Sequence, residues 1–113
     1  MMSPVGQFRV FAICLTLAAG SNVMLAAGKG DAAKGKEVFK QYCGVCHNAN
    51  SEEKKMGPGL KRLFKKEKLN SGKRPTEANI RAKVDGGGNG MPAYKEMLSG
   101  PEKDDLIAHL KTL

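Results

Sequence analysis

Two cysteines and a histidine lie within five residues of one another, in the segment Cys43-Gly44-Val45-Cys46-His47. The C-x-x-C-H spacing is typical of a site for covalent haem attachment. Two thiols three positions apart can each form a thioether with one of the two vinyl groups of a single porphyrin, and the histidine that follows can bind the iron as its proximal ligand. The motif therefore predicts one haem held covalently by Cys43 and Cys46, with His47 as an axial ligand.

Three other kinds of site use part of this motif. A structural zinc site needs four Cys or His ligands, and outside the motif the chain has only Cys14 and His109. A thioredoxin-like dithiol needs a βαβ context and has no use for the histidine. A disulfide between Cys43 and Cys46 would leave His47 without a role. Haem attachment uses all three side chains and is the favoured interpretation.

The first 27 residues have the layout of a secretory signal peptide. Arg9 is their only charge, and an apolar stretch over 10–19 follows it. Small residues come next, at Gly20, Ser21, Ala26 and Ala27. We expect cleavage near Ala27, although cuts after Gly20 or Ser21 also fit the small-residue pattern. The alternative is an uncleaved membrane anchor, because residues 10–27 approach a bilayer-spanning length. Residues 28–113 then form one exported, periplasmic domain.

This remaining chain is short, basic and poor in aromatic side chains. It has no Trp and two Tyr, which makes a thin core for so small a domain; a buried porphyrin would supply the missing apolar mass. The formal net charge is +8, and removal of residues 1–27 lowers it by one. A basic surface favours partners with acidic docking surfaces. Nucleic acid is disfavoured as a partner, because few aromatics accompany the lysines.

Apolar periodicity predicts helices and no strand. Asp31 would cap a helix over 32–42, where Gly35 indicates that another backbone packs close. A short basic helix is expected over 60–69 and another from Pro75 to Val84.

The last helix has two alternative starts. Ser99 and Glu102 fit a capping box, and Gly100 followed by proline fits equally well. The expected apolar face of this helix consists of Leu106, Ile107, Leu110 and Leu113.

One methionine lies between a glycine-rich run and a proline. Residues 85–90 are mostly glycine, and Pro92 keeps Met91 out of helical geometry. A thioether is a soft ligand that favours ferrous iron. We therefore expect Met91 to be the sixth iron ligand. The alternative is a core methionine, with Met56 and Met97 as rival ligands.

Taken together, these segments resemble the class I cytochromes c in their short bacterial form. The resemblance covers residues 30–113 and rests on four signatures in order: Gly35…Phe39 before Cys43–His47, then Gly57-Pro58-x-Leu60, then Gly90-Met91-Pro92-Ala93-Tyr94, then Leu106-Ile107-Ala108-His109-Leu110-Lys111. It implies an all-α fold, the small cytochrome c fold, in which the N- and C-terminal helices cross around one covalently bound haem c.

The resemblance also assigns roles to individual residues. It implies Cys43 and Cys46 as thioether anchors, His47 and Met91 as axial ligands, and Pro58, Leu60 and Tyr94 as parts of the haem pocket. The Pro58 carbonyl would accept a hydrogen bond from the His47 ring, which fixes the tautomer. Gly35 and Phe39 would meet Leu106 and Leu110 at the helix crossing.

Two features depart from the family pattern. Position 109 is His where an aromatic residue is usual, and we interpret it as a packing residue that could lower stability or add a pH dependence. The chain also has no Trp to hydrogen-bond a haem propionate; the sequence assigns no partner in its place, and Lys, Arg and Tyr are the candidates.

The predicted function is one-electron transfer in the periplasm by a monomeric His/Met-ligated cytochrome. It would not be an enzyme, because protein ligands fill both axial positions. No stable membrane insertion is expected once the signal is cleaved. Two alternatives stay open: a dedicated cytochrome subunit of a dehydrogenase or oxidase complex, and a haem catalyst or sensor if Met91 does not bind the iron.

Overall fold

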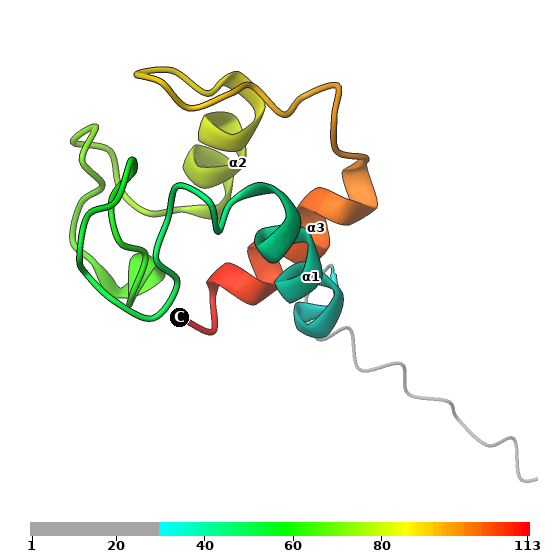
Figure 1. The fold of residues 1–113 in the computed structure, drawn as a ribbon, viewed down its shortest axis with the longest axis horizontal. Helices are drawn as coiled ribbons and strands as arrows, with labels where there is room; N and C mark the ends of the chain where they lie inside the picture. The colour runs from blue at the N-terminus through cyan, green and yellow to red at the C-terminus, as the bar shows by residue number, and fades with distance from the viewer. Residues whose placement is uncertain (1–29) are drawn as a thin grey trace, which may run out of the picture.

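The computed structural model describes residues 30–113, which form helices joined by long loops (Figure 1). The elements are α1 (Ala32–Tyr42), the 3₁₀ helix η1 (Leu63–Lys65), α2 (Glu77–Gly86) and α3 (Gly100–Leu110). In this part of the chain no β-strand forms, and an isolated bridge joins Gly88 to Met91. The all-α fold expected from the sequence is confirmed.

The expected signal peptide, residues 1–27, lies outside the described residues. From residue 30 onward, every helix is too short or too polar to cross a bilayer.

The first helix, α1, begins and packs largely as its sequence predicts. The Asp31 side chain accepts hydrogen bonds from the backbone N–H groups of Ala33 and Lys34, which caps the helix. The helix lies directly against α3 (Figure 1). A Cβ atom at Gly35 would overlap the carbonyl oxygen of Asp105, so glycine permits the close approach of the two helices.

The crossing involves the residues expected from the sequence. Phe39 shares the buried core with Leu106 and Leu110. The atoms nearest to a Cβ at Gly35 belong to Asp105 and His109, the residues that directly precede these two leucines.

The last helix, α3, starts at the capping box. The Ser99 hydroxyl accepts from the Glu102 N–H, and the Glu102 carboxylate accepts from the Ser99 N–H; Gly100 is therefore the first helical residue and not the cap. The prediction that Leu113 belongs to the helix was wrong, because α3 ends at Leu110. The Thr112 hydroxyl and N–H both donate to the His109 carbonyl and turn the chain away.

The prediction of a basic helix over 60–69 was also wrong, since only η1 forms there. Arg62 has a left-handed backbone with φ of 59°, and Lys66 is extended, so the segment is helical for a single turn. Like charges four positions apart, such as Lys61 and Lys65, disfavour a longer helix. The turn still buries Leu63, which is 7% exposed.

The remaining helix, α2, is capped by the Thr76 hydroxyl and extends two residues beyond the expected end at Val84. It contributes Ile80 and Val84 to the core, which also includes Tyr94 and Leu98 from the segment that follows it. This core lies between α2 and the crossed pair of α1 and α3.

Candidate cofactor site

The C-x-x-C-H segment begins where α1 ends. The N–H groups of Cys43 and Gly44 both donate to the Phe39 carbonyl, at 2.8 Å each. The N–H groups of Cys46 and His47 donate back to the Cys43 carbonyl, at 3.1 and 3.0 Å. These bonds wind the segment into a tight turn at the end of the helix, and both thiols are free and half-buried. Two thiols separated by one turn match the spacing that two thioethers to one porphyrin require.

The Cys43 thiol lacks the electrostatics of a redox-active cysteine. Burial, with a smaller contribution from the neighbouring Cys46, raises the pKa of the Cys43 thiol to about 11. Redox-active cysteines instead have lowered pKa values, because the thiolate is the reacting form. Among residues 30–113 no three His, Cys, Asp or Glu side chains gather as a bound metal ion would require.

His47 is held in one orientation. Its Nδ1 lies 2.8 Å from the carbonyl oxygen of Pro58, so the hydrogen bond expected from the sequence is confirmed. A carbonyl oxygen only accepts, so Nδ1 carries the proton and Nε2 keeps a free lone pair. A Cβ atom at Gly57 would lie 2.8 Å from Nδ1, so only glycine fits against the ring. The imidazole is thereby prepared to bind a metal through Nε2.

The three methionines of the described segment differ in burial. Met56 and Met97 have exposed fractions of 77% and 55%. Met91 is half-buried and packs against the hydrophobic core. An apolar ligand to a buried cofactor needs such a position, which favours Met91 over its rivals.

A tight loop presents Met91. Its N–H and carbonyl pair with the carbonyl and N–H of Gly88, at 3.1 and 2.9 Å. Positive φ angles recur at Gly87, Gly88, Asn89 and Gly90, a conformation that glycine adopts without strain. At Gly87 a Cβ would also overlap the carbonyl of Met91, so glycine is required for space as well.

Tyr94 brings the Met91 segment next to the cysteine motif. Its buried hydroxyl donates to the carbonyl of Tyr42 at 2.9 Å, directly before Cys43. Burial, and then the nearby thiols of Cys43 and Cys46, raise the pKa of Tyr94 above its ordinary value. The segments around Met91 and Cys43, far apart in the sequence, therefore meet in the fold.

Leu60 packs on the same core, and its N–H donates to the Asn48 carbonyl at 2.8 Å. The Met56 sulfur lies 3.8 Å from the Cys46 sulfur, on the exposed side of the motif.

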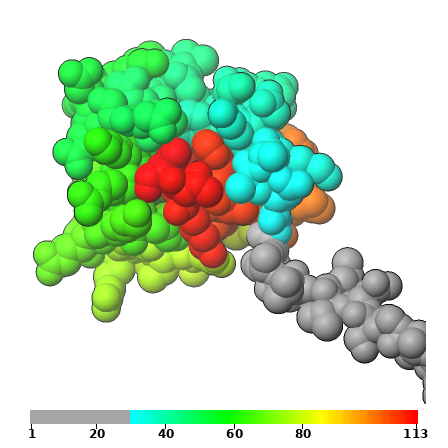
Figure 2. Space-filling view, turned by 90° about the horizontal axis from the view of Figure 1, so that it is seen from below, coloured from blue at the N-terminus to red at the C-terminus, as the bar shows by residue number. Residues whose placement is uncertain are grey.

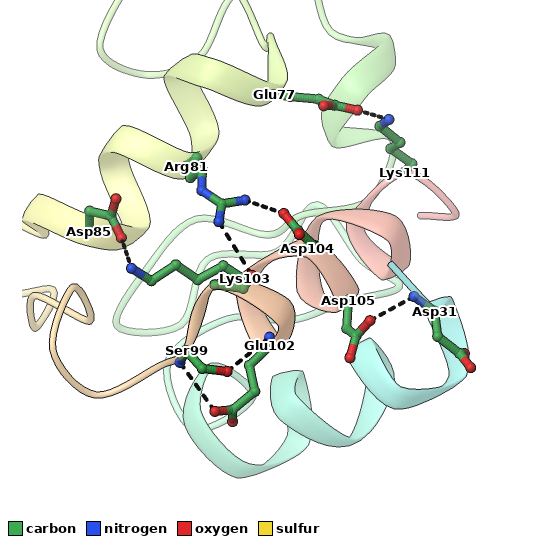
Figure 3. A network of polar contacts seen from close by, with 11 residues as sticks. Asp31, Glu77, Arg81, Asp85, Ser99, Glu102, Lys103, Asp104, Asp105 and Lys111 are labelled. Carbon is green, nitrogen blue, oxygen red and sulfur yellow. Dashed lines mark hydrogen bonds and ion pairs between the residues drawn. The ribbon is translucent and has the colours of Figure 1, made fainter. Parts of the chain in front are cut away.

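Sequence reasoning missed a set of polar contacts between α2 and α3 (Figure 3). They join Glu77 to Lys111, Arg81 to Asp104 and Asp85 to Lys103. The α2 partners recur four positions apart with alternating sign, a pattern that would have indicated a charged face opposite another helix.

Two surface cavities lie away from the cysteine motif. One, of about 320 Å³, lies near Phe64 and Pro75. The other, of about 480 Å³, is lined by the first turns of α1, the loop at Ala49 and the C-terminal residues, with Phe39 and His109 beneath. Figure 2 shows this face, with the C-terminal end in red between α1 in cyan and the loops in green. Neither cavity is lined by the cysteines, His47 or Met91.

Comparison with known proteins places these features in a family. Residues 30–110 match the family described as "Cytochrome C oxidase, cbb3-type, subunit III". The fold is similar to that of cytochrome c6 from the diatom Phaeodactylum tricornutum, with a TM-score of 0.58 and 29% sequence identity. That match covers 74% of this chain and 93% of the diatom protein.

Proposed function

This chain belongs to the family of cbb3-type cytochrome c oxidase subunit III and is a small class I monohaem cytochrome with one covalently bound haem c; from this we propose that it carries single electrons in the periplasm through a His/Met-ligated iron. The observation that supports this best is the His47 ring. Its Nδ1 is engaged by the Pro58 carbonyl, and its Nε2 is left for a metal.

The donor set of the site fits this group. Cys43 and Cys46 would hold the haem by thioethers, and His47 and Met91 would be the axial ligands, a combination that raises the reduction potential. A bound haem c supplies a one-electron couple between ferric and ferrous iron. The chain contributes the fixed imidazole, the methionine held by its glycine loop, and a pocket that includes Pro58, Leu60 and Tyr94. Two protein ligands leave no open position, so we propose a carrier and not an enzyme.

A second candidate function has one observation in its favour. The matching family is described as a subunit of an oxidase, so the chain could serve one complex instead of diffusing between partners. A free carrier elutes as a monomer and reduces or oxidises more than one partner. A dedicated subunit co-purifies with its complex.

The first prediction tests the ligands. In the holoprotein, denaturing acid extraction should leave the haem on the polypeptide, and Cys43→Ala or Cys46→Ala should sharply lower the yield of holoprotein. The ferric protein should show the weak near-infrared charge-transfer band of a sulfur–iron bond. Met91→Ala should abolish that band and open the iron to added ligands, because the thioether is lost.

Met56→Ala and Met97→Ala are the matched controls and should keep the band, since both side chains are exposed. Haem that extracts freely would rule out covalent attachment. If the band survives Met91→Ala but disappears in one of the two controls, the sixth ligand is that other methionine and not Met91.

A further inference from the structure

One lysine of the α2–α3 interface is buried. The side chain of Lys103 is 10% exposed, whereas the side chains of Arg81 and Lys111 are 35% and 44% exposed. A buried ammonium group is costly unless it is paired and hydrogen-bonded. The contacts of Lys103 should therefore matter more than those of the other two cations.

The two partners of Lys103 lie on either side of the Met91 loop. Its Nζ is 2.6 Å from Oδ1 of Asp85, near the end of α2 (Figure 3), and 3.1 Å from the carbonyl oxygen of Lys95, just beyond Tyr94. The segment between these two positions is 86–94, which contains the glycine run and Met91. One ammonium group thus contacts both ends of the loop.

Two backbone hydrogen bonds also join the two ends of the loop. The Tyr94 N–H donates to the Val84 carbonyl at 2.9 Å, and the Lys95 N–H donates to the Asp85 carbonyl at 3.3 Å. The second bond is long for an N–H···O hydrogen bond. This bond joins the same two residues that Lys103 contacts, Asp85 and Lys95. We therefore expect the bond to depend on the contacts of Lys103.

Asp85 depends on Lys103 in turn. Its Oδ1 is buried, and among the described residues no donor reaches it at a hydrogen-bonding angle, so the contact with Lys103 is an ion pair. Without the ammonium group this carboxylate oxygen would be buried and uncompensated, which drives such a group out towards water. That movement would open the loop at its α2 end.

We propose that Lys103 is a positioning residue that keeps the Met91 loop closed and so keeps the methionine sulfur on the iron. The inference rests on the proposed ligation by Met91. It concerns a residue on α3 that contacts neither the ligand nor the cysteine motif directly.

The Arg81–Asp104 pair provides a matched control. Arg81 also joins α2 to α3, through Asp104 and through the Gly100 carbonyl at 3.3 Å. Its guanidinium group forms no hydrogen bond or ion pair with Asp85 or Lys95. Arg81→Met and Lys103→Met therefore both remove one cation from the same interface, and only the second should affect the loop.

The experiment measures imidazole binding to the ferric holoprotein and hydrogen exchange of the Tyr94 and Lys95 amides. Added imidazole competes with Met91, so its apparent affinity reports the fraction of molecules with the loop open. Lys103→Met should bind imidazole about tenfold more tightly than Arg81→Met, when the two variants are compared under conditions that give them equal unfolding free energy. Lys103→Met should also speed hydrogen exchange of the Tyr94 and Lys95 amides. Lys103→Arg, which keeps the charge and the donors, should restore both values towards wild type.

Several outcomes would overturn the proposal. Equal imidazole affinity in Lys103→Met and Arg81→Met, with equal amide exchange, would make Lys103 a structural residue only. If Lys103→Met does not fold, Asp85→Asn tests the same contact from the other side and should shift both readouts in the same direction. Wild-type protein that binds imidazole as tightly as Met91→Ala would refute the proposed ligation instead, and the amide exchange would still test the role of Lys103.

Discussion

His109 replaces an aromatic residue at the helix crossing, and the structure buries it there. Its exposed fraction is 8%, and its ring centroid lies 5.5 Å from that of Phe39 with the planes tilted by 60°. Burial first, and then the nearby Lys36 ammonium of α1, lower the pKa of His109 below its ordinary value. Lys40 and the C-terminal Leu113 line the cavity above it, and Asp105 precedes it by one turn of α3. The interpretation as a packing residue fits these contacts.

The sign of the resulting pH dependence follows from the lowered pKa. Folded His109 binds protons less readily than unfolded His109, so its contribution to stability is complete above about pH 6.5 and is lost as the pH falls through the lowered folded value. We predict that the free energy of unfolding of the holoprotein decreases between about pH 7.5 and about pH 5. Denaturant titrations at both pH values measure it.

His109→Phe is the control, because it keeps an aromatic ring against Phe39 without a titratable group. Its unfolding free energy should fall less over the same range. Parallel pH profiles for the two proteins would contradict a role for His109.

At the scale of elements, the contact between α1 and α3 depends on the missing side chain at Gly35. The space that a Cβ would need is occupied by backbone, namely the Asp105 carbonyl, and by the Cβ of His109 at 2.9 Å. Backbone atoms cannot rotate away as the end of a long side chain can. Any larger residue must therefore push the two helices apart.

We predict that Gly35→Ala lowers the free energy of unfolding by about 2 kcal/mol or more, because overpacking here separates two helices. This cost exceeds the gain of roughly 1 kcal/mol that alanine normally brings to a helix interior. Chemical denaturation of the holoproteins measures it.

Gly100→Ala serves as the control, since a Cβ there meets nothing within 4 Å. Its effect should stay within about 0.5 kcal/mol. A Gly35→Ala protein as stable as wild type would mean that the two helices do not approach as closely as described.

At the scale of the whole molecule, some basic residues form ion pairs with acidic side chains and others do not. Within residues 30–113 the ion pairs use Lys40, Arg81, Lys103 and Lys111. The lysines that form no such pair among these residues include a group of five between residues 61 and 73: Lys61, Lys65, Lys66, Lys68 and Lys73. Four of these five are exposed, and Lys66 is partly buried. For any one of them the simplest role is solvation of the surface, while together they form a positive field that could steer an acidic partner.

We predict that the second-order electron-transfer rate with the native partner falls as ionic strength rises, because salt screens charges beyond about 8–10 Å. Stopped-flow measurements over a salt series test this. Reversing Lys65 and Lys68 to Glu should lower the rate at low salt by about tenfold and leave the optical spectrum unchanged.

Reversing Lys34 and Lys40 to Glu on α1 changes the net charge equally and should have the smaller effect. A rate that is flat or rises with salt would show that the basic surface does not dock the partner.

Local chemistry determined the parts of the molecule that could be predicted from the sequence. The cap at Asp31 involves residues within three positions, so its hydrogen bonds follow from residue type and spacing. For the last helix the spacing left two starts open, and the structure selects the capping box of Ser99 with Glu102. The C-x-x-C-H motif is likewise a local pattern. Its chemistry is set by two thiols and an imidazole on one turn of chain.

Tertiary structure decided the rest, because the partners involved are distant in sequence. No local rule selects the Asp105 carbonyl as the neighbour of Gly35, or joins Lys103 to the two ends of the Met91 loop. The segment 60–69 shows the same limit: its apolar spacing suits a helix, yet Arg62 turns left-handed and Leu63 is buried by a single turn. Burial against a core assembled from the whole chain outweighs the weak preference of a short, highly charged segment.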